Sequence, residues 1–272
     1  MKSFHRRTSR PASHPVVATA PVAHRDGLRA DQLLVERHLA PSRTVAQRLI
    51  EAGRVSWTEG VIGKPSAILP ASAELTVMDD DLDRYVSRGG IKLAGALAHT
   101  GLDVRGKICL DVGQSTGGFT DCLLQAGAAS VVGVDVGHDQ LSAKLRTDPR
   151  VTCVEGVNAR ELQESAVAAR RYDLIVGDLS FISLTLVLPQ LPPLLEPNGD
   201  MLLLVKPQFE VGPENVGKGG IVRDIALYPA VEAKLRQAAE AIGLRVLDYF
   251  DSPIAGTDGN REFFIWTQHE KH

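Results

Sequence analysis

Seven short apolar runs, separated by segments with helical spacing, recur between residues 108 and 267. Near-continuous hydrophobicity in short runs is typical of strands that are buried on both faces of a sheet. Helical segments around residues 120–125 and 229–241 fall between such runs, as in βαβ units. The alternation predicts a doubly wound, Rossmann-like α/β fold with a seven-stranded, mostly parallel sheet over residues 87–272. The runs are Ile108–Val112, Ser130–Val136, Val151–Val157, Tyr172–Asp178, Met201–Lys206, Arg245–Asp251 and Phe263–Thr267.

A glycine-rich loop, Asp111-Val-Gly-Gln-Ser-Thr-Gly-Gly-Phe119, follows the first of these runs. Doubly wound sheets bind ligands outside the carboxyl ends of their strands, so this loop is placed to contact one. Gly113 and Gly117 let the backbone approach a ligand, and Gly118 opens the following helix. The spacing G-x-x-x-G-G differs from the G-x-G-x-x-G of dinucleotide dehydrogenases, which speaks against a nicotinamide oxidoreductase.

Polar residues at the ends of the next two runs complete a predicted nucleoside site. Asp135 lies where a carboxylate can accept both hydroxyls of an adenosine ribose. Asn158 follows the third run and is expected to face the adenine. Together with the glycine loop, they predict a nucleoside-binding cleft. The residues expected to contact the nucleoside cofactor are Asp111, Gly113, Ser115, Gly117, Gly118, Phe119, Asp135, Val136, Asn158 and Asp178.

The fourth run ends in Gly177-Asp-Leu-Ser-Phe181. Methyltransferases that attack exocyclic amines usually carry an Asp/Asn-Pro-Pro-aromatic loop at this point, and this chain lacks the prolines. An oxygen is therefore the expected methyl acceptor. Methyl transfer from a sulfonium is an in-line displacement, so the protein mainly has to align oxygen, carbon and sulfur.

Four charged residues fall at the rim of the predicted cleft, namely Lys92, Asp178, Lys206 and Glu262. A ribose 2′-hydroxyl is a weak acid, so a lysine amine can take its proton while carboxylates orient the lysines. Lys206 is the candidate base. The sequence also allows a purely structural ion pair between Asp178 and Lys206, and it allows Lys92 and Glu262 to be ordinary surface charges.

Two further features border the cleft. Phe119, Phe181 and Phe209 are expected to pack in the core or in loops rather than to stack on a base. The segment of residues 207–220 is rich in glycine and proline and carries Lys218. Its position directly after Lys206 predicts a mobile lid above the cleft, with a solvent-exposed linker as the alternative.

The N-terminal part of the chain is basic, although the net charge of the whole chain is −3. Residues 1–54 hold ten Lys and Arg against four acidic residues, a formal +6, which leaves −9 for the remainder. A basic front on an acidic body is typical of a protein that docks a polyanion with one end. Residues 1–27, rich in Arg, Ser, Pro and Ala, are expected to form a disordered tail.

Residues 28–80 predict a small α+β domain. Leu33, Leu34 and Leu39 have helical spacing, Ser42 fits a helix N-cap, and Gly53 fits a C-cap before short strands around residues 55–57, 61–62, 69 and 75–77. The order R-x-D-x-L-L-V…S-R-x-x-A-x-x-L-I-x-x-G-x-V…K-P-S over residues 29–66 resembles the S4 RNA-binding domain. A module for protein contacts is the alternative. The residues expected to bind RNA are Arg29, Arg43, Arg48 and Arg54, with Arg88 and Lys218 beside the cleft.

Other features of the sequence concern the linker, the cellular compartment, metal binding and membrane spans. The acidic run Asp79–Asp83 marks a domain boundary, with a linker expected at residues 81–86. Cys109, Cys122 and Cys153 form no C-x-x-C pair and are expected to be reduced core residues, which indicates a cytoplasmic protein. The eight histidines lack ligand spacing, so no metal site is expected. The longest apolar stretches are too short to span a membrane.

The four charged residues match, in order, the K-D-K-E tetrad of FtsJ-like RNA ribose methyltransferases, whose first motif resembles the glycine loop. With the S4-like front, the chain from about residue 28 resembles the haemolysin-A-type (TlyA) family. The resemblance implies a Rossmann-like methyltransferase that uses S-adenosylmethionine on a ribose 2′-hydroxyl of cytidine. It implies 16S and/or 23S ribosomal RNA as the substrate and ribosomal subunits as partners. The other matching motifs are Tyr85–Leu93, Lys206–Glu210 and Gly219–Asp224.

Two other function classes stand against this interpretation. The haemolysin name of the family suggests a pore-forming protein, but the sequence has no membrane span, cationic amphipathic helix or credible secretion signal. The second class is a non-catalytic ribosome-assembly factor that kept the cofactor fold. Lysis of liposomes would favour the first class, and absence of methyl transfer by the wild-type chain would favour the second.

Overall fold

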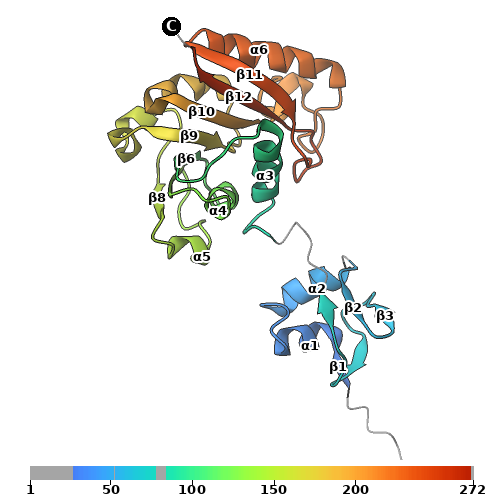
Figure 1. The fold of residues 1–272 in the computed structure, drawn as a ribbon. Helices are drawn as coiled ribbons and strands as arrows, with labels where there is room; N and C mark the ends of the chain where they lie inside the picture. The colour runs from blue at the N-terminus through green and yellow to red at the C-terminus, as the bar shows by residue number, and fades with distance from the viewer. Residues whose placement is uncertain (1–26, 52, 78–83, 271–272) are drawn as a thin grey trace, which may run out of the picture. The chain divides into compact units, whose positions relative to one another are not determined.

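The computed structural model describes residues 27–51, 53–77 and 84–270 of the 272-residue chain. The chain divides into two compact units, Met1–Met78 and Asp79–His272 (Figure 1). The basic tail predicted for residues 1–27, except its last residue, lies outside the described residues, as does the acidic run taken as the domain boundary.

The first unit is a small α+β domain with one apolar core. Strand β1 pairs antiparallel with β4, and β2 pairs antiparallel with both β3 and β5. Gly27 lies opposite Pro70 in the first of these pairs, so it belongs to a strand and not to the predicted tail. The elements are β1 (Gly27–Arg29), α1 (Ala30–Glu36), α2 (Arg43–Glu51), β2 (Val55–Trp57), β3 (Gly60–Val61), β4 (Ile68–Pro70) and β5 (Thr76–Val77).

The ends of the helices follow the predicted capping chemistry. Ser42 Oγ accepts a hydrogen bond from Val45 N at 3.4 Å at the start of α2. Gly53, just beyond the end of α2, has a φ of +70°, a conformation that costs glycine little. Leu39 departs from expectation, because α1 ends at Glu36 and leaves this side chain exposed.

The second unit contains a seven-stranded sheet in the order β11-β12-β10-β9-β6-β7-β8. Five neighbouring strands, from β10 to β8, run parallel, whereas β12 lies antiparallel between β10 and β11. The prediction of a mostly parallel, seven-stranded sheet is therefore confirmed. The strands are β6 (Ile108–Val112), β7 (Ser130–Asp135), β8 (Val151–Glu155), β9 (Tyr172–Gly177), β10 (Leu195–Val205), β11 (Leu244–Asp251) and β12 (Phe263–His269).

Apolar layers cover both faces of this sheet. Successive side chains of a strand point to opposite faces, so Leu110 joins the layer that contains α6 while Cys109 joins the layer that contains α3 and α4. Both faces are buried, which explains the near-continuous hydrophobicity of the central strands. The α-helices of this unit are α3 (Gly89–Thr100), α4 (Gly118–Gln125), α5 (Ala143–Arg146) and α6 (Tyr228–Glu240).

Strand β8 differs from the central strands because it lies at the edge of the sheet and pairs only with β7. Thr152 and Cys153 are exposed on it. The prediction that Cys153 is a core residue is therefore wrong, because an edge strand lacks a second neighbour to cover it. Cys109 and Cys122 are buried free thiols, as expected.

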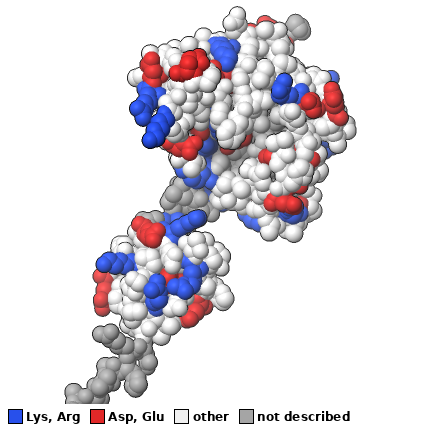
Figure 2. Space-filling model, turned by 180° about the vertical axis from the view of Figure 1, so that it is seen from behind, with Lys and Arg blue, Asp and Glu red and all other residues white. Residues whose placement is uncertain are grey.

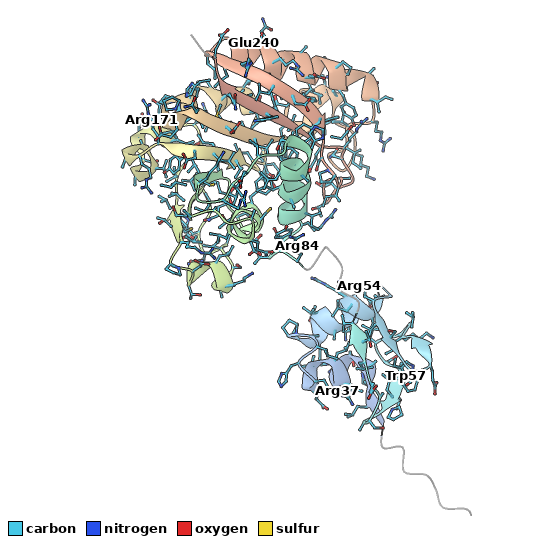
Figure 3. All side chains as sticks on the ribbon, viewed as in Figure 1. Arg37, Arg54, Trp57, Arg84, Arg171 and Glu240 are labelled. Atoms are coloured by element: carbon cyan, nitrogen blue, oxygen red, sulfur yellow. The ribbon has the colours of Figure 1, made fainter. Side chains whose placement is uncertain are left out.

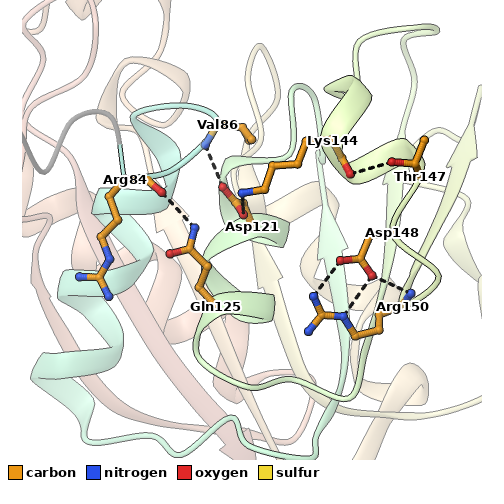
Figure 4. Close-up of polar contacts among 8 residues, drawn as sticks. All are labelled: Arg84, Val86, Asp121, Gln125, Lys144, Thr147, Asp148 and Arg150. Atoms are coloured by element: carbon orange, nitrogen blue, oxygen red, sulfur yellow. Dashed lines mark hydrogen bonds and ion pairs between the residues drawn. The ribbon is translucent and has the colours of Figure 1, made fainter. Parts of the chain in front are cut away.

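The beginning of the second unit is fixed to α4 (Figure 4). Gln125 Nε2 donates to the carbonyl oxygen of Arg84 at 3.0 Å, and Val86 N donates to the buried carboxylate of Asp121 at 2.9 Å. The ring of Tyr85 is buried and fills the space that a side chain at Gly90 would need. Residues 84–86 therefore belong to the second unit, whereas the sequence had placed them in the linker. Local polarity does not reveal these long-range contacts.

Candidate active site

Two lysine–carboxylate pairs line one pocket of about 650 Å³, here called the tetrad pocket. Lys206 Nζ lies 2.6 Å from Asp178 Oδ1, and Lys92 Nζ lies 2.6 Å from Glu262 Oε2. The side chains of Lys92 and Glu262 are only 9% and 3% exposed, so the alternative that they are surface charges is wrong. A buried charge is stable only when it is paired, and here each pair satisfies that need.

The sheet explains how four residues far apart in sequence meet. Asp178 and Lys206 directly follow the neighbouring parallel strands β9 and β10. Strand β12 runs antiparallel to β10, with Phe263 opposite Val205, so Glu262 at its start lies at the same edge of the sheet. Lys92 reaches this edge from the first turn of α3. The carboxyl ends of the parallel strands thus carry the predicted tetrad.

The glycine loop lines both the tetrad pocket and a second pocket of about 480 Å³, here called the nucleoside pocket. Gly113 lines both pockets and has a φ of +85°. A Cβ at this position would lie 2.7 Å from the carbonyl oxygen of Asp178, so the close approach of the two loops requires glycine. Gly117 lines neither pocket, and its φ of +94° and the neighbouring Leu145 side chain indicate a role in the loop turn.

Asp135 ends β7 and lines the nucleoside pocket. Its Oδ2 accepts from Ser115 N and its Oδ1 accepts from Gly137 N, each at 2.7 Å. An ionised carboxylate has about four acceptor sites, so these bonds leave capacity for ribose hydroxyls. Asp135 therefore both shapes the glycine loop and presents acceptors to the pocket. Val136 and Asn158 line the same pocket.

Asp111 lines neither pocket but lies buried beneath the glycine loop. Thr120 Oγ1 donates to its Oδ2 at 2.7 Å, and Gln114 Nε2 donates to Thr120 Oγ1 at 2.9 Å. Asp111 Oδ1 and Gln114 Oε1 have no hydrogen-bond partner among the described residues. Burial raises the pKa of Asp111 to about 7. Gln114, which lines the tetrad pocket, escaped the sequence analysis because a single glutamine in a loop gives no distinctive signal.

Because the pKa of Asp111 is raised in the folded chain, the stability of the fold should depend on pH. Below about pH 4 both the folded and the unfolded chain keep this proton, whereas between about pH 4 and 7 only the folded chain does. The stability of the wild type should therefore decline through this range as the pH rises. Asp111→Asn cannot ionise, so its melting temperature should gain several degrees relative to the wild type between pH 5 and pH 8.

Thermal unfolding of the cofactor-free protein at both pH values measures this effect. Asp103→Asn is the control, because hydrogen bonds from Arg105 lower the pKa of exposed Asp103 to about 2. Its melting temperature relative to the wild type should not change between pH 5 and pH 8. Equal pH profiles for wild type and Asp111→Asn would contradict the prediction.

The aromatic residues divide in a way that the sequence did not indicate. Phe119 is 3% exposed and packs in the core, as expected, although its edge also lines the tetrad pocket. Phe181 is 91% exposed and has a φ of +64°, which is unusual for a bulky residue. It lines both pockets, and its ring centroid lies 5.3 Å from that of Phe209. Phe181 therefore does not pack in the core; it contacts Phe209 between two loops and leaves most of its side chain exposed.

The predicted lid segment is held at a defined point. Asn260 is buried, and its Oδ1 accepts from Val222 N at 3.0 Å while its Nδ2 donates to the carbonyl oxygen of Gly220 at 2.8 Å. Gly219 and Gly220 line the tetrad pocket, and Lys218 beside them is exposed. Movement of this segment stays a prediction.

Two of the four predicted RNA-binding arginines of the first unit, Arg29 and Arg43, pair with one carboxylate. Asp31 is fully buried, and it pairs with Arg29 at 2.9 Å and with Arg43 at 3.0 Å. Gln47 Nε2 also donates to it at 3.0 Å. The hydrogen bond from Arg29 is the largest cause that holds the pKa of Asp31 well below its usual range. Both guanidinium groups are partly exposed, so Asp31 fixes two cations beside each other at the surface.

Other arginines of this unit have different surroundings. Arg37, labelled in Figure 3, donates to the carbonyl oxygens of Ala71 and Ala73 and thus braces the turn after β4. Arg48 is exposed on α2. Lys and Arg side chains gather on the face of this unit shown in Figure 2. In the second unit, exposed Arg88 lines the tetrad pocket and donates to the carbonyl oxygen of Ala255 at 3.1 Å.

Asp31→Asn tests whether the buried carboxylate prepares Arg29 and Arg43 for phosphate binding. Loss of the charge should free both side chains, and ordering them again on binding costs about 1–2 kcal/mol, on the order of tenfold in RNA affinity. Glu36→Gln, an exposed site on the same helix, removes an equal charge and is the control. Binding of structured RNA at two salt concentrations measures both variants. Equal affinity would show that Asp31 serves only the fold.

No group of three or more His, Cys, Asp or Glu residues suited to a metal ion occurs within residues 27–51, 53–77 and 84–270. Within the described residues, no helix has the length and apolar character needed to cross a membrane.

Comparison with known proteins agrees with this architecture. The S4 domain model matches residues 28–72 and the FtsJ-like methyltransferase model matches residues 85–269. A protein of Mycobacterium tuberculosis named 16S/23S rRNA (cytidine-2′-O)-methyltransferase TlyA is 45% identical over 238 residues, or 88% of each chain. Hemolysin A of Brachyspira hyodysenteriae is 37% identical over 236 residues, which cover 87% of this chain and 98% of that protein. A solved structure from Streptococcus thermophilus that carries a hemolysin name has a TM-score of 0.68 and 39% identity, covering 91% of this chain and 90% of the other.

An S4 domain followed by a doubly wound domain with this glycine loop and tetrad defines an FtsJ-like methyltransferase that carries an S4 domain. Among such proteins, the chain belongs to the TlyA family. The family resemblance and the fold class predicted from the sequence are thus confirmed.

Proposed function

We propose that this methyltransferase transfers a methyl group from S-adenosylmethionine to the 2′-hydroxyl of a cytidine ribose in 16S and/or 23S ribosomal RNA. The observation that carries the proposal is the two lysine–carboxylate pairs, one buried and one partly exposed, in a pocket that shares the glycine loop with a nucleoside-sized pocket. The name of the Mycobacterium tuberculosis relative, which states this reaction, supports the choice of substrate. The cytoplasm, where ribosomes reside, is the proposed location.

The nucleoside pocket suits the adenosine part of the cofactor. Asp135 provides carboxylate acceptors for the ribose, and Asn158 provides a polar group at the rim. Apolar side chains of Val134, Val157 and Ile182 line the same pocket and suit the faces of an adenine ring. The buried, unpartnered oxygen of Gln114 beside the glycine loop is an acceptor of the kind that a bound ammonium group satisfies.

The tetrad supplies the chemistry at the acceptor. When bound, S-adenosylmethionine supplies the methyl group as part of a sulfonium. Lys206 Nζ takes the proton of the 2′-hydroxyl, while Asp178 at 2.6 Å and Ser180 Oγ at 2.8 Å hold the amine in place. Lys92, held by Glu262, directs positive charge toward the oxygen on which negative charge develops.

Phe181 gives the pocket a surface for a nucleobase. Its exposed ring lies at the junction of both pockets, beside Phe209. Single-stranded or unstacked nucleotides bind proteins by stacking on such rings, so Phe181 is proposed to hold the target base while Lys206 faces its ribose. The backbone strain at this residue fits a functional position.

Incubation of separate small and large ribosomal subunits with methyl-labelled S-adenosylmethionine, followed by mapping of the modified ribose, tests the proposal. We expect a labelled 2′-O-methylcytidine in at least one subunit and no label in free cytidine. Label on a base, or equal labelling of free nucleosides, would overturn it. Binding of subunits without any transfer would favour the assembly-factor alternative, and lysis of liposomes by the purified protein would favour the pore-forming one.

A further inference from the structure

Glu210 lies outside both pockets, yet its carboxylate is among the most buried charges of the second unit, with 1% of the side chain exposed. It follows the short turn η7 (Pro207–Phe209), four residues after Lys206. A buried carboxylate is costly unless donors surround it. The groups that donate hydrogen bonds to the Glu210 carboxylate therefore indicate its role.

The donors come from two separate parts of the fold, the loop that follows β9 and helix α6. Leu184 N donates to Glu210 Oε1 at 2.7 Å, and Ser183 Oγ donates to Oε2 at 2.6 Å. Lys234 Nζ, on α6, donates to Oε2 at 2.9 Å and to the backbone oxygen of Glu210 at 3.0 Å. Ser183 and Leu184 end the loop that begins at Asp178, whereas Glu210 ends the loop that begins at Lys206.

The same two loops meet again at the tetrad pocket. There the ion pair between Lys206 and Asp178 spans them, together with the bond from Lys206 Nζ to Ser180 Oγ. The ring contact of Phe181 with Phe209 also joins them. All these contacts lie at the pocket, where substrate would bind. The bonds of Glu210 lie outside the pocket and can persist while the contacts at the pocket change.

We propose that Glu210 is a positioning residue for methyl transfer, because its buried carboxylate ties the loop of Asp178 to the loop of Lys206 and sets the distance between them. The inference rests on the proposed function of the tetrad. A displacement of about 1 Å between reacting groups can cost on the order of a hundredfold in rate. Loosening this tie should therefore lower the rate of the chemical step, whereas RNA binding and cofactor binding use other residues.

Glu210→Gln removes the charge with little change in shape, and Asp200→Asn is the matched control. Asp200 is also a buried carboxylate, with Trp266 Nε1 at 2.8 Å, Gln268 Nε2 at 2.7 Å and Lys107 at 3.5 Å. It lies on the strand that leads to Lys206, about 20 Å before it along the chain. Both variants lose a buried charge, but only Glu210 joins the loops of the tetrad, whereas Asp200 does not.

Single-turnover rates with ribosomal subunits, KM for the subunits, affinity for S-adenosylmethionine and melting temperature should be measured for both variants. We expect Glu210→Gln to lower the rate by on the order of 10–100-fold, with KM and cofactor affinity within about threefold of wild type. Asp200→Asn should lower the melting temperature comparably but keep the rate within about threefold. A wild-type rate for folded Glu210→Gln, or equal rate losses in both variants, would overturn the inference.

Two additional variants keep the test decisive. If Glu210→Gln does not fold, Ser183→Ala removes one bond between the loops and leaves the other donors, and we expect roughly a fivefold to tenfold loss of rate. A wild-type rate for Ser183→Ala in that case would overturn the inference. Lys206→Met, assayed in parallel, separates the two proposals: an active Lys206→Met would refute the proposed role of the tetrad, whereas an inactive Lys206→Met beside a fully active Glu210→Gln would refute only the role of Glu210.

Discussion

Lys206→Met should lower the rate of methyl transfer to ribosomal subunits by about 10²–10⁴-fold, the range that a positioned acid–base group contributes. The substitution keeps most of the side-chain volume but removes the amine that lies 2.6 Å from Asp178 and 2.8 Å from Ser180 Oγ. The tetrad pocket would then have no group at this position to take the proton of the 2′-hydroxyl. Cofactor affinity should change little, because Lys206 does not line the nucleoside pocket.

The control for this variant is Lys107→Met. Lys107 is also a partly buried lysine beside a carboxylate, Asp200 at 3.5 Å, but it lines neither pocket. Single-turnover rates of both variants, at a temperature where circular dichroism shows them folded, give the comparison. A Lys206→Met protein that retains more than about a tenth of the wild-type rate would exclude Lys206 as the base.

Asp135→Asn should weaken S-adenosylmethionine binding by about 3 kcal/mol, on the order of a hundredfold in Kd. The carboxylate accepts from Ser115 N and Gly137 N, so an amide in its place turns a donor toward one of these N–H groups or toward the cofactor ribose. The substitution should therefore distort the glycine loop and remove an acceptor for the ribose hydroxyls. Calorimetric titration of the protein with S-adenosylmethionine measures the change.

Asp139→Asn serves as the control for cofactor binding. Its side chain is 87% exposed, pairs with Arg146 at 3.3 Å and does not line the nucleoside pocket. Asparagine also tolerates the positive φ of this position. Its Kd should remain within about twofold of wild type. Similar affinities for Asp135→Asn and Asp139→Asn would contradict the proposed cofactor site.

The two defects should also respond differently to cofactor concentration. Asp135→Asn removes binding interactions, so a large excess of S-adenosylmethionine should restore much of its rate. Lys206→Met removes a group that acts on the acceptor, so no excess should restore it. A Lys206→Met rate that recovers at high cofactor concentration would place Lys206 in cofactor binding instead.

Sequence patterns were most informative where the physical cause is local. The apolar runs identified all seven strands of the sheet, and for the central strands the reason is burial on both faces, which leaves a continuous apolar signature. The glycine loop was recognisable because the close approach of Gly113 to the carbonyl oxygen of Asp178 excludes any side chain. Where the local cause was absent, as at edge strand β8, the same reasoning placed Cys153 in a core that it does not reach.

The sequence by itself determined that Lys92, Asp178, Lys206 and Glu262 follow one another in an order typical of the family, and that the last three lie at strand ends. Only the tertiary structure decided which of them pair, because the pairing depends on β12 lying antiparallel beside β10. The exposure of Phe181 and the bonds of Glu210 were likewise settled there. Such contacts join residues far apart in the chain, so the order in which the strands assemble in the sheet creates them.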